Sequence, residues 1–325
     1  MLAVSGGISV NVTAEKIRGA VIGAAVGDAT GVPYEFIPPE KIKLNPVTDM
    51  VGRGTYNMPA GTWSDDTTMI LCTLDKLDGS LDYDAIMRAF LSWLDDGNYT
   101  PYGECFDIGN TTHTALVNYS RGGGALSPGL TDAHSNGNGS LMRIIPVALY
   151  ADAHGLSAGQ AVNLSHEISS LTHAHPISKT GCGIFTCVAT SLLESADRQS
   201  VLRGIKTAET VYSSEINTPE IIKYRRIFDE GFPELPESVI KSSGYVVDTL
   251  ECALWCVLNT DNYRDCVLKA VNFGNDTDTA ACVAGALGGL LYGLEGIPVR
   301  WRETLVKSDY INTIISGFCQ RNNIE

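Results

Sequence analysis

Residues 275–294 read NDTDTAACVAGALGGLLYGL, a polar start followed by an uncharged run with the 3.6-residue apolar period of a buried helix. Asp276 and Asp278 are two residues apart and would point to opposite sides of a continuous helix. Both can face one ion only if the backbone at these residues forms a turn that precedes the helix. We therefore expect the helix to begin near Thr279. The glycines that leave room for a second helix to approach closely are Gly285, Gly288 and Gly289.

A second helix with small residues is predicted near the start of the chain. Thr13 can cap it, and its glycines would also let a neighbour approach closely; they are Gly19, Gly23 and Gly27. Convincing period-two strands are not found. The same helical period can be followed over residues 68–77, 83–94, 160–171, 177–193, 249–257 and 279–294. The sequence therefore predicts a mainly α-helical chain with long Gly-rich and Asn-rich connections.

Composition limits the class of protein. The length of 325 residues allows one large domain or two ordinary ones, and the 44 % hydrophobic content is enough to bury a sizeable core. We expect one domain over residues 1–325, with residues 1–12 as a flexible N-terminus. A net charge of -14 argues against nucleic-acid binding, because phosphate affinity comes from clustered Lys and Arg. The 9 cysteines lack metal-site or CxxC spacing, which is typical of buried thiols in a reducing compartment. No secretory signal is found, and the uncharged run 280–294 is shorter than the roughly 20 residues that span a bilayer. We expect a cytoplasmic monomer that binds no membrane.

Two acidic clusters dominate the polar segments. Residues 64–67 read SDDT and residues 275–279 read NDTDT, and each cluster opens an apolar stretch. Carboxylate and hydroxyl oxygens are the ligands that Mg²⁺ and Mn²⁺ prefer, and four gathered carboxylates would repel one another without cations. Helix capping alone, which contributes about 1 kcal/mol per cap, is the alternative. Because each cluster holds more acids than a cap needs, the pair favours a split site for two hard metal ions.

Residues 27–36, GDATGVPYEF, leave the first small-residue helix and enter a turn that is predicted to expose Glu35. Glu35 could act as a general acid or base, or as a mobile carboxylate that closes over a metal. A solvated loop glutamate is the alternative. Asp28 is expected to cap or brace its own turn, without a chemical function.

Residues 136–140, NGNGS, alternate glycine with polar residues. Glycines at positive φ could turn successive N–H groups toward a phosphate, and a helix from Leu141 would add its positive end. An ordinary tight turn is the alternative. Arg143 could reach the same phosphate or form a buried ion pair.

His173 and His175 are spaced as in some zinc hydrolases, but no third His or Cys supports that interpretation. His173 could instead stack on or hydrogen-bond a nucleotide base, or be structural. Asp107, which precedes a capped helix, could meet a cationic group of a substrate. The sequence has no Walker A loop, nucleophile elbow or GxGxxG turn.

Six blocks, taken in order, make the sequence resemble the ADP-ribosylglycohydrolase family over about residues 15–295. They are GDATGVPYEF, GTWSDDTTMIL, FDIGNTT, GNGSLMRIIPVAL, LTHAHP and NFGNDTDTAACVAGALGGLLYG. The resemblance implies an all-α fold, a single compact domain of orthogonal helices, with a dinuclear Mg²⁺ or Mn²⁺ centre at helix N-termini and loops. It also implies an enzyme that removes ADP-ribose from modified side chains.

The resemblance also assigns functions to individual residues. The implied metal ligands are Ser64, Asp65, Asp66, Asp276, Asp278 and Thr279, with Ser64 standing where many relatives have Thr. The implied catalytic residues are Glu35, Asp65, Asp107 and Asp278, with Glu35 near the scissile bond and Asp107 near the leaving group. The implied substrate contacts are Asn138, Gly139 and Ser140 along the diphosphate or distal ribose, and His173 near the adenosine.

We therefore expect a dinuclear-metal hydrolase that acts on an ADP-ribosylated protein and releases ADP-ribose. The FDIGNTT block resembles members that act on ADP-ribosyl-arginine. Two cations can bind the ribose hydroxyls and activate water, and cleavage should pass through an oxocarbenium-like state. The alternatives are cleavage of serine-linked or O-acetyl-ADP-ribose, or a catalytically silent ADP-ribose-binding or structural protein. The complete acid set argues against silence.

Overall fold

The structure, a computed structural model, describes residues 11–325, and the regular elements of this range are helices. Three isolated β-bridges occur there, but no β-strand. The α-helices are α1 Ala14–Gly31, α2 Pro39–Leu44, α3 Asp65–Lys76, α4 Tyr83–Asp96, α5 Asn110–Ser120, α6 Ile145–Ala153, α7 Ala158–Ser170, α8 Pro176–Glu194, α9 Arg198–Val211, α10 Pro219–Ile222, α11 Val246–Leu258, α12 Tyr263–Asn272, α13 Thr277–Gly296, α14 Val299–Thr304 and α15 Ser308–Arg321. The predicted all-α class is confirmed.

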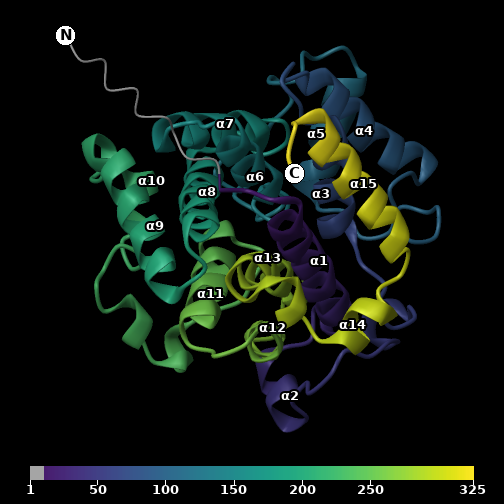
Figure 1. Cartoon of the computed structure of the whole chain (residues 1–325), viewed down its shortest axis with the longest axis vertical. Coiled ribbons are helices and arrows are strands. Elements are labelled where there is room, and N and C mark those ends of the chain that lie inside the picture. Colours follow the sequence, from purple (N-terminus) through teal and green to yellow (C-terminus); the bar gives the residue numbers. More distant parts are fainter. Residues whose placement is uncertain (1–10) are drawn as a thin grey trace.

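The interface between α1 and α13 lies at the centre of the molecule (Figure 1). The two backbones touch there. A Cβ atom added to Gly23 would lie closer than 3.0 Å to the carbonyl oxygen of Gly285, and one added to Gly27 would come equally close to that of Ala281. Only glycine permits this approach, because any side chain would push the helices apart. Each glycine-rich helix therefore has the close neighbour that its sequence predicts, and the structure shows that the two helices are neighbours of each other.

The other helices surround this pair. Helices α8, α11 and α12 pack against α13, while α3 and α15 pack against α1 (Figure 1). From α12, Tyr263 inserts its ring into the core and donates a 2.6 Å hydrogen bond from its hydroxyl to the carbonyl of Gly23. By length and composition α13 could cross a membrane, but 72 % of its apolar window is buried inside the fold. Burial in the core accounts for its apolar composition.

Several boundaries differ from the prediction. The helix expected to begin near Thr279 begins at Thr277, so that Asp276 occupies its N-cap and Asp278 its first turn. Helix α1 continues to Gly31 rather than turning after Gly27. Helix α15 was not predicted. Residues 1–10 of the predicted flexible N-terminus lie outside the described residues.

The first described residues are attached to the fold. The backbone N–H groups of Asn11 and Val12 each donate a 2.7 Å hydrogen bond to the Asp152 carboxylate at the end of α6, and Val12 is buried. These bonds place the start of α1, which Thr13 caps as predicted by accepting from the N–H of Lys16.

Candidate metal centre and substrate cleft

The α1–α13 interface brings the two predicted acidic clusters together. At the end of α1, Gly31 packs on the backbone of Asp278, and the hydroxyl of Thr277 donates a 2.8 Å hydrogen bond to the Gly31 carbonyl. Helix α3 packs beside α1, so its first turn reaches the start of α13. The hydroxyl of Thr279 lies 3.3 Å from Oδ2 of Asp66. Residues far apart in the sequence thus form one site.

Asp28 connects α1 to the cluster on α3. Its buried carboxylate accepts two hydrogen bonds of 3.0 Å from the Ser64 N–H, one of 2.9 Å from the Ser64 hydroxyl, and others from the N–H and hydroxyl of Thr67. Burial raises the pKa of Asp28 to about 6, although these hydrogen bonds oppose the shift. The prediction that Asp28 braces its own turn is wrong, because it holds the start of another helix.

Ser64 caps α3, accepting a 3.4 Å hydrogen bond from the N–H of Asp66. The capping interpretation is therefore correct for this hydroxyl. It does not account for Asp65 and Asp66, which follow in the first turn, where the positive end of the helix dipole stabilises carboxylates. Both carboxylates remain available for another function.

The buried acids lack counter-charges of their own. Burial, followed by the charges of neighbouring acids, raises the pKa values of Asp65, Asp66 and Asp278 well above their ordinary range. Asp66 Oδ1 and Asp278 Oδ2 have no hydrogen-bond partner although both are buried. Buried unpaired carboxylate oxygens destabilise a protein unless a cation binds them. This all-oxygen donor set fits a hard divalent cation.

Glu35 and Asp107 complete the acidic group. Single carboxylate oxygens of Glu35, Asp107 and Asp278 lie within 4.8 Å of one another, close enough to share a metal ion. Glu35 follows the 3₁₀ turn Val32–Tyr34 and is buried, not exposed as predicted. Asp107 has φ +52 in the loop before α5, a conformation that non-glycine residues rarely adopt. The structure thus unites predicted catalytic residues with predicted ligands.

Tyr56 holds Glu35 in this group. Its hydroxyl donates a 2.7 Å hydrogen bond to Oε2 of Glu35, and its ring packs edge-on against Phe106, with centroids 5.4 Å apart. Burial and the charge of Asp107 raise the pKa of Glu35 to about 9. In the absence of bound cations, the carboxyl of Glu35 therefore carries a proton near neutral pH.

A cleft of about 440 Å³ lies over these acids. Among its lining residues are Glu35, Phe36, Asp65, Asp107, Asn138, Gly139, His173, Asp276 and Thr279. The other predicted ligands, Ser64, Asp66 and Asp278, are buried and do not line it, but Asp66 contacts Thr279 and Asp278 lies beside Glu35 and Asp107. The predicted residues for metal, catalysis and substrate therefore lie in this cavity or next to its lining, with one exception.

That exception is Ser140. It is fully buried and accepts a 2.8 Å hydrogen bond from the hydroxyl of Ser169, so it does not line the cleft. Residues 140–143 form turns, and α6 begins only at Ile145. Neither Gly137 nor Gly139 has positive φ. The predicted helix from Leu141 and the predicted positive φ of the glycines are therefore wrong, while contact of Asn138 and Gly139 with a diphosphate stays a prediction.

Asn138 and Gly139 do lie at the cleft, for other reasons. The Asn138 side-chain amide donates 2.9 Å hydrogen bonds to Oδ2 of Asp276 and to the hydroxyl of Thr249. Asn138 thereby positions a predicted ligand. A Cβ atom on Gly139 would lie 2.9 Å from Cε1 of His173, so glycine is required by close packing against the imidazole.

The two predicted histidines have different environments. His173 is buried against the cleft and hydrogen-bonded at 2.8 Å to Thr172, and burial lowers its pKa to about 3. His175 caps α8, where Nδ1 accepts from the N–H of Ile177. Arg143 makes neither of its predicted contacts. It is fully buried, 4.8 Å over the Phe90 ring, with a 2.8 Å hydrogen bond to Thr172.

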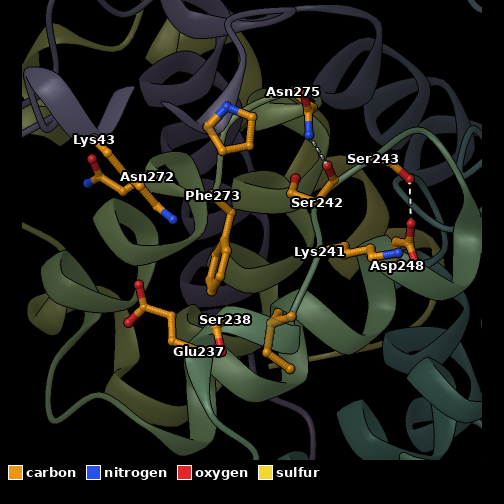
Figure 2. A pocket seen from close by; sticks show the side chains of 12 residues that line it. Lys43, Glu237, Ser238, Lys241, Ser242, Ser243, Asp248, Asn272, Phe273 and Asn275 are labelled. Atoms are coloured by element: carbon orange, nitrogen blue, oxygen red, sulfur yellow. Dashed lines mark hydrogen bonds between the residues drawn. The ribbon is translucent and has the colours of Figure 1, made fainter. Parts of the chain in front are cut away.

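A second hollow, of about 490 Å³, lies behind one wall of the cleft. Figure 2 shows Asn275 and Ser242 joined across its rim, where the Asn275 amide donates 2.8 Å to the Ser242 carbonyl. The hydroxyl of Ser242 donates 2.9 Å to the carbonyl of Asp276. None of the predicted site residues lines this hollow, but Ser242 in its wall holds the backbone of the predicted ligand Asp276.

Sequence reasoning missed two residues that shape the site. Tyr56 lies in a loop without a recognisable motif, so nothing in the sequence indicates its contact with Glu35. The sequence does indicate a function for Asp28, because a carboxylate among the small residues of a buried helix must accept hydrogen bonds from donors on other elements.

Comparisons with known proteins agree with this geometry. The ADP-ribosylglycohydrolase family model matches residues 9–323. The ADP-ribosylarginine hydrolase Tri1 of Pseudomonas putida is 35 % identical over 94 % of this chain and 78 % of its own length. The ADP-ribosyl-(dinitrogen reductase) glycohydrolase of Rhodospirillum rubrum is 29 % identical over 90 % of both chains. A solved ADP-ribosylglycohydrolase-related protein complex aligns with a TM-score of 0.77 and 27 % identity, covering 95 % of this chain and 98 % of the other.

Proposed function

The chain belongs to the ADP-ribosylglycohydrolase family, and on this premise we propose that it is a hydrolase that releases ADP-ribose from ADP-ribosyl-arginine on a protein. The similarity to ADP-ribosylarginine hydrolases at 35 % and 34 % identity supports the arginine linkage. The observation that carries the proposal is the grouping of Glu35, Asp107 and Asp278 within 4.8 Å at the cleft.

The proposed cofactor is a pair of Mg²⁺ or Mn²⁺ ions. Helices α3 and α13 each contribute two carboxylates and one hydroxyl: Ser64, Asp65, Asp66, Asp276, Asp278 and Thr279. Asp66 on α3 and Asp278 on α13 each have a buried carboxylate oxygen without a hydrogen-bond partner, which supports the proposal that each helix contributes to cation binding. Bound ions would supply Lewis-acid polarisation of the ribose hydroxyls and a water of lowered pKa.

Glu35 is the proposed proton carrier. Tyr56 holds one of its carboxyl oxygens, and the group faces Asp107 and Asp278. The pKa of about 9 belongs to Glu35 among the acids alone, and two bound cations would lower it. Glu35 then lies close to the scissile bond as a carboxyl group that can exchange a proton with water or the leaving group. The surrounding carboxylates would stabilise the positive charge that develops on the ribose during cleavage.

Asp107 is the proposed partner of the leaving group. An arginine leaves as a planar guanidinium, which a carboxylate can orient by paired hydrogen bonds. The nucleotide then extends along Asn138 and Gly139 toward His173. Because its pKa is about 3, His173 is neutral there and can contact the adenosine through hydrogen bonding or stacking.

We further propose that the enzyme is a cytoplasmic monomer that binds neither nucleic acid nor a membrane. All nine cysteines are free, and eight of them are buried, which is consistent with a reducing compartment. The net charge of -14 supports the absence of nucleic-acid binding. Light scattering after size exclusion would test the monomer.

One assay tests the activity and its linkage. The purified protein is incubated with arginine-, serine- and acetyl-linked ADP-ribose, with and without EDTA, and liberated ADP-ribose is measured. We expect release from the arginine linkage, its loss in EDTA, and its return when Mg²⁺ or Mn²⁺ is added in excess. Release mainly from the serine or acetyl linkage would replace the proposed substrate. Binding of ADP-ribose without any release would identify a silent protein.

A further inference from the structure

Phe36 has a conformation that its side chain disfavours. Its φ is +63, in the left-handed region that bulky residues rarely occupy, and its side chain is 67 % exposed. A strained backbone of this kind costs roughly 1–3 kcal/mol and persists only where surrounding contacts maintain it. Exposure of a large aromatic ring adds a further cost. Phe36 lines the cleft directly after Glu35.

Hydrogen bonds on both sides maintain this conformation. The N–H of Phe36 donates 2.6 Å to the carbonyl of Asn275, whose own N–H donates 2.8 Å to the carbonyl of Ile37. On the other side, the hydroxyl of Thr55 donates 2.7 Å to the carbonyl of Glu35. The backbone at Phe36 is thereby attached to the residue that precedes Asp276, and its side chain lines the same cleft as Glu35 and Asp107.

We propose that Phe36 determines specificity for a guanidinium leaving group by stacking on its face. This inference rests on the proposed arginine linkage. A guanidinium presents N–H donors at its edge and an apolar face above and below its plane. Asp107 can accept from the edge while the ring of Phe36 covers the face, since both residues line the same cleft. The negative π-face of the ring attracts a cation, so the two contacts act together.

The same ring offers little to a serine leaving group. Serine leaves as a neutral hydroxyl without a planar face, so neither the charge nor the stacking contact is available. Phe36 should therefore favour the arginine linkage without contributing to the binding of ADP-ribose, which lacks the guanidinium.

The test compares Phe36→Leu with Phe36→Tyr. Leucine keeps an apolar side chain but has no π-face, whereas tyrosine keeps it. Leu44→Ala serves as the control, because Leu44 is an exposed apolar residue of neighbouring α2 that does not line the cleft. We measure kcat/KM on an ADP-ribosyl-arginine peptide and the Kd for ADP-ribose by calorimetry.

We expect Phe36→Leu to lower kcat/KM about three- to thirtyfold, the range of a cation–π contact, with the Kd for ADP-ribose unchanged. Phe36→Tyr should restore the wild-type value, and Leu44→Ala should retain it. Wild-type kcat/KM in Phe36→Leu, or an equal loss of ADP-ribose binding, would overturn the inference while leaving the proposed function intact. A wild-type protein inactive on the arginine linkage would overturn both.

Discussion

The hydroxyl of Ser64 donates a 2.9 Å hydrogen bond to the carboxylate of Asp28, joining the last turn of α1 to the N-cap of α3. This bond lies behind the acidic group, away from the cleft. Asp28 therefore positions Asp65 and Asp66 without facing the substrate.

Asp28→Asn should weaken both the fold and the metal site. The amide replaces one acceptor oxygen with donors that face the N–H and O–H groups of Ser64 and Thr67. Leaving such groups unpaired costs about 1–3 kcal/mol, so we expect a comparable loss in the free energy of unfolding. Urea denaturation measures this loss, and Mn²⁺ titration should show weaker binding. The matched control is Asp309→Asn, which changes an exposed acid on α15. Equal stability and Mn²⁺ affinity in Asp28→Asn and the wild type would contradict this prediction.

Asp278→Asn should have opposite effects with and without metal. In EDTA the variant should melt at a higher temperature than the wild type, because it removes one of several buried, mutually repelling carboxylates. In Mg²⁺ it should gain less stability, because it has lost a ligand. Release of ADP-ribose should fall at least about a hundredfold. Asp65→Asn should lose activity to a similar extent. The checks are thermal melting in both buffers and the release assay; near-normal turnover in either variant would exclude the metal centre.

Gly23→Ala should destabilise the α1–α13 interface. The added methyl group would lie closer than 3.0 Å to the Gly285 carbonyl, a rigid backbone atom. Overpacking of this kind costs about 1–3 kcal/mol and sometimes more. Gly159→Ala is the matched control, because Gly159 lies in helix α7 with no atom near an added Cβ. That variant should be unchanged or up to about 1 kcal/mol more stable. Denaturation midpoints that shift equally in both would refute the close-packing argument.

Acid should destabilise the fold partly through His173. Its pKa is lowered to about 3 by burial, against 6.5 for an ordinary histidine. Above pH 6.5 His173 is neutral in both the folded and the unfolded chain, so it does not change the free energy of unfolding. Between pH 6.5 and 3 the unfolded chain binds a proton at this histidine and the folded chain does not, so the free energy of unfolding falls as the pH drops. At pH 5 this linkage amounts to about 2 kcal/mol. In His173→Asn the fall in unfolding free energy between pH 7 and 5 should be smaller by that amount, and an equal fall in the variant and the wild type would contradict this prediction.

The sequence predicted the parts of the fold that carry strong periodic patterns. Helices α4, α7, α8 and α11 lie within a few residues of their predicted ranges, because each combines an apolar face with clear end signals. Helices α9, α12 and α15 were not predicted. The local pattern of α15 was overlooked, because its buried apolar residues do have helical spacing: Ile311, Ile314, Ile315, Phe318 and Cys319. In α9 the small or polar residues Ser200, Gly204 and Ala208 form part of the buried face, and only packing against α8 makes them so.

The site was predictable where residue chemistry alone limits the possibilities. The acids of the two clusters converge as their residue chemistry predicts, while Glu35 and Asp107 join them as only the family resemblance implied. The burial of Glu35 and the orientation of Ser140 were not predictable. Both depend on which way a loop turns against distant elements, such as Asn275 for the first and Ser169 for the second. Tyr56 is a contact of the same kind.

The glycine contacts between α1 and α13 also bear on when activity can arise during synthesis. Gly23 leaves the ribosome long before Gly285. Until both have emerged, α1 and α13 cannot pack together, so Asp28 and Asp278 are not held near each other. A nascent chain can form many of its peripheral helices, yet it cannot cage a cation. The protein therefore cannot act on a modified partner before α13 has been synthesised, so products truncated before Gly285 should be inert.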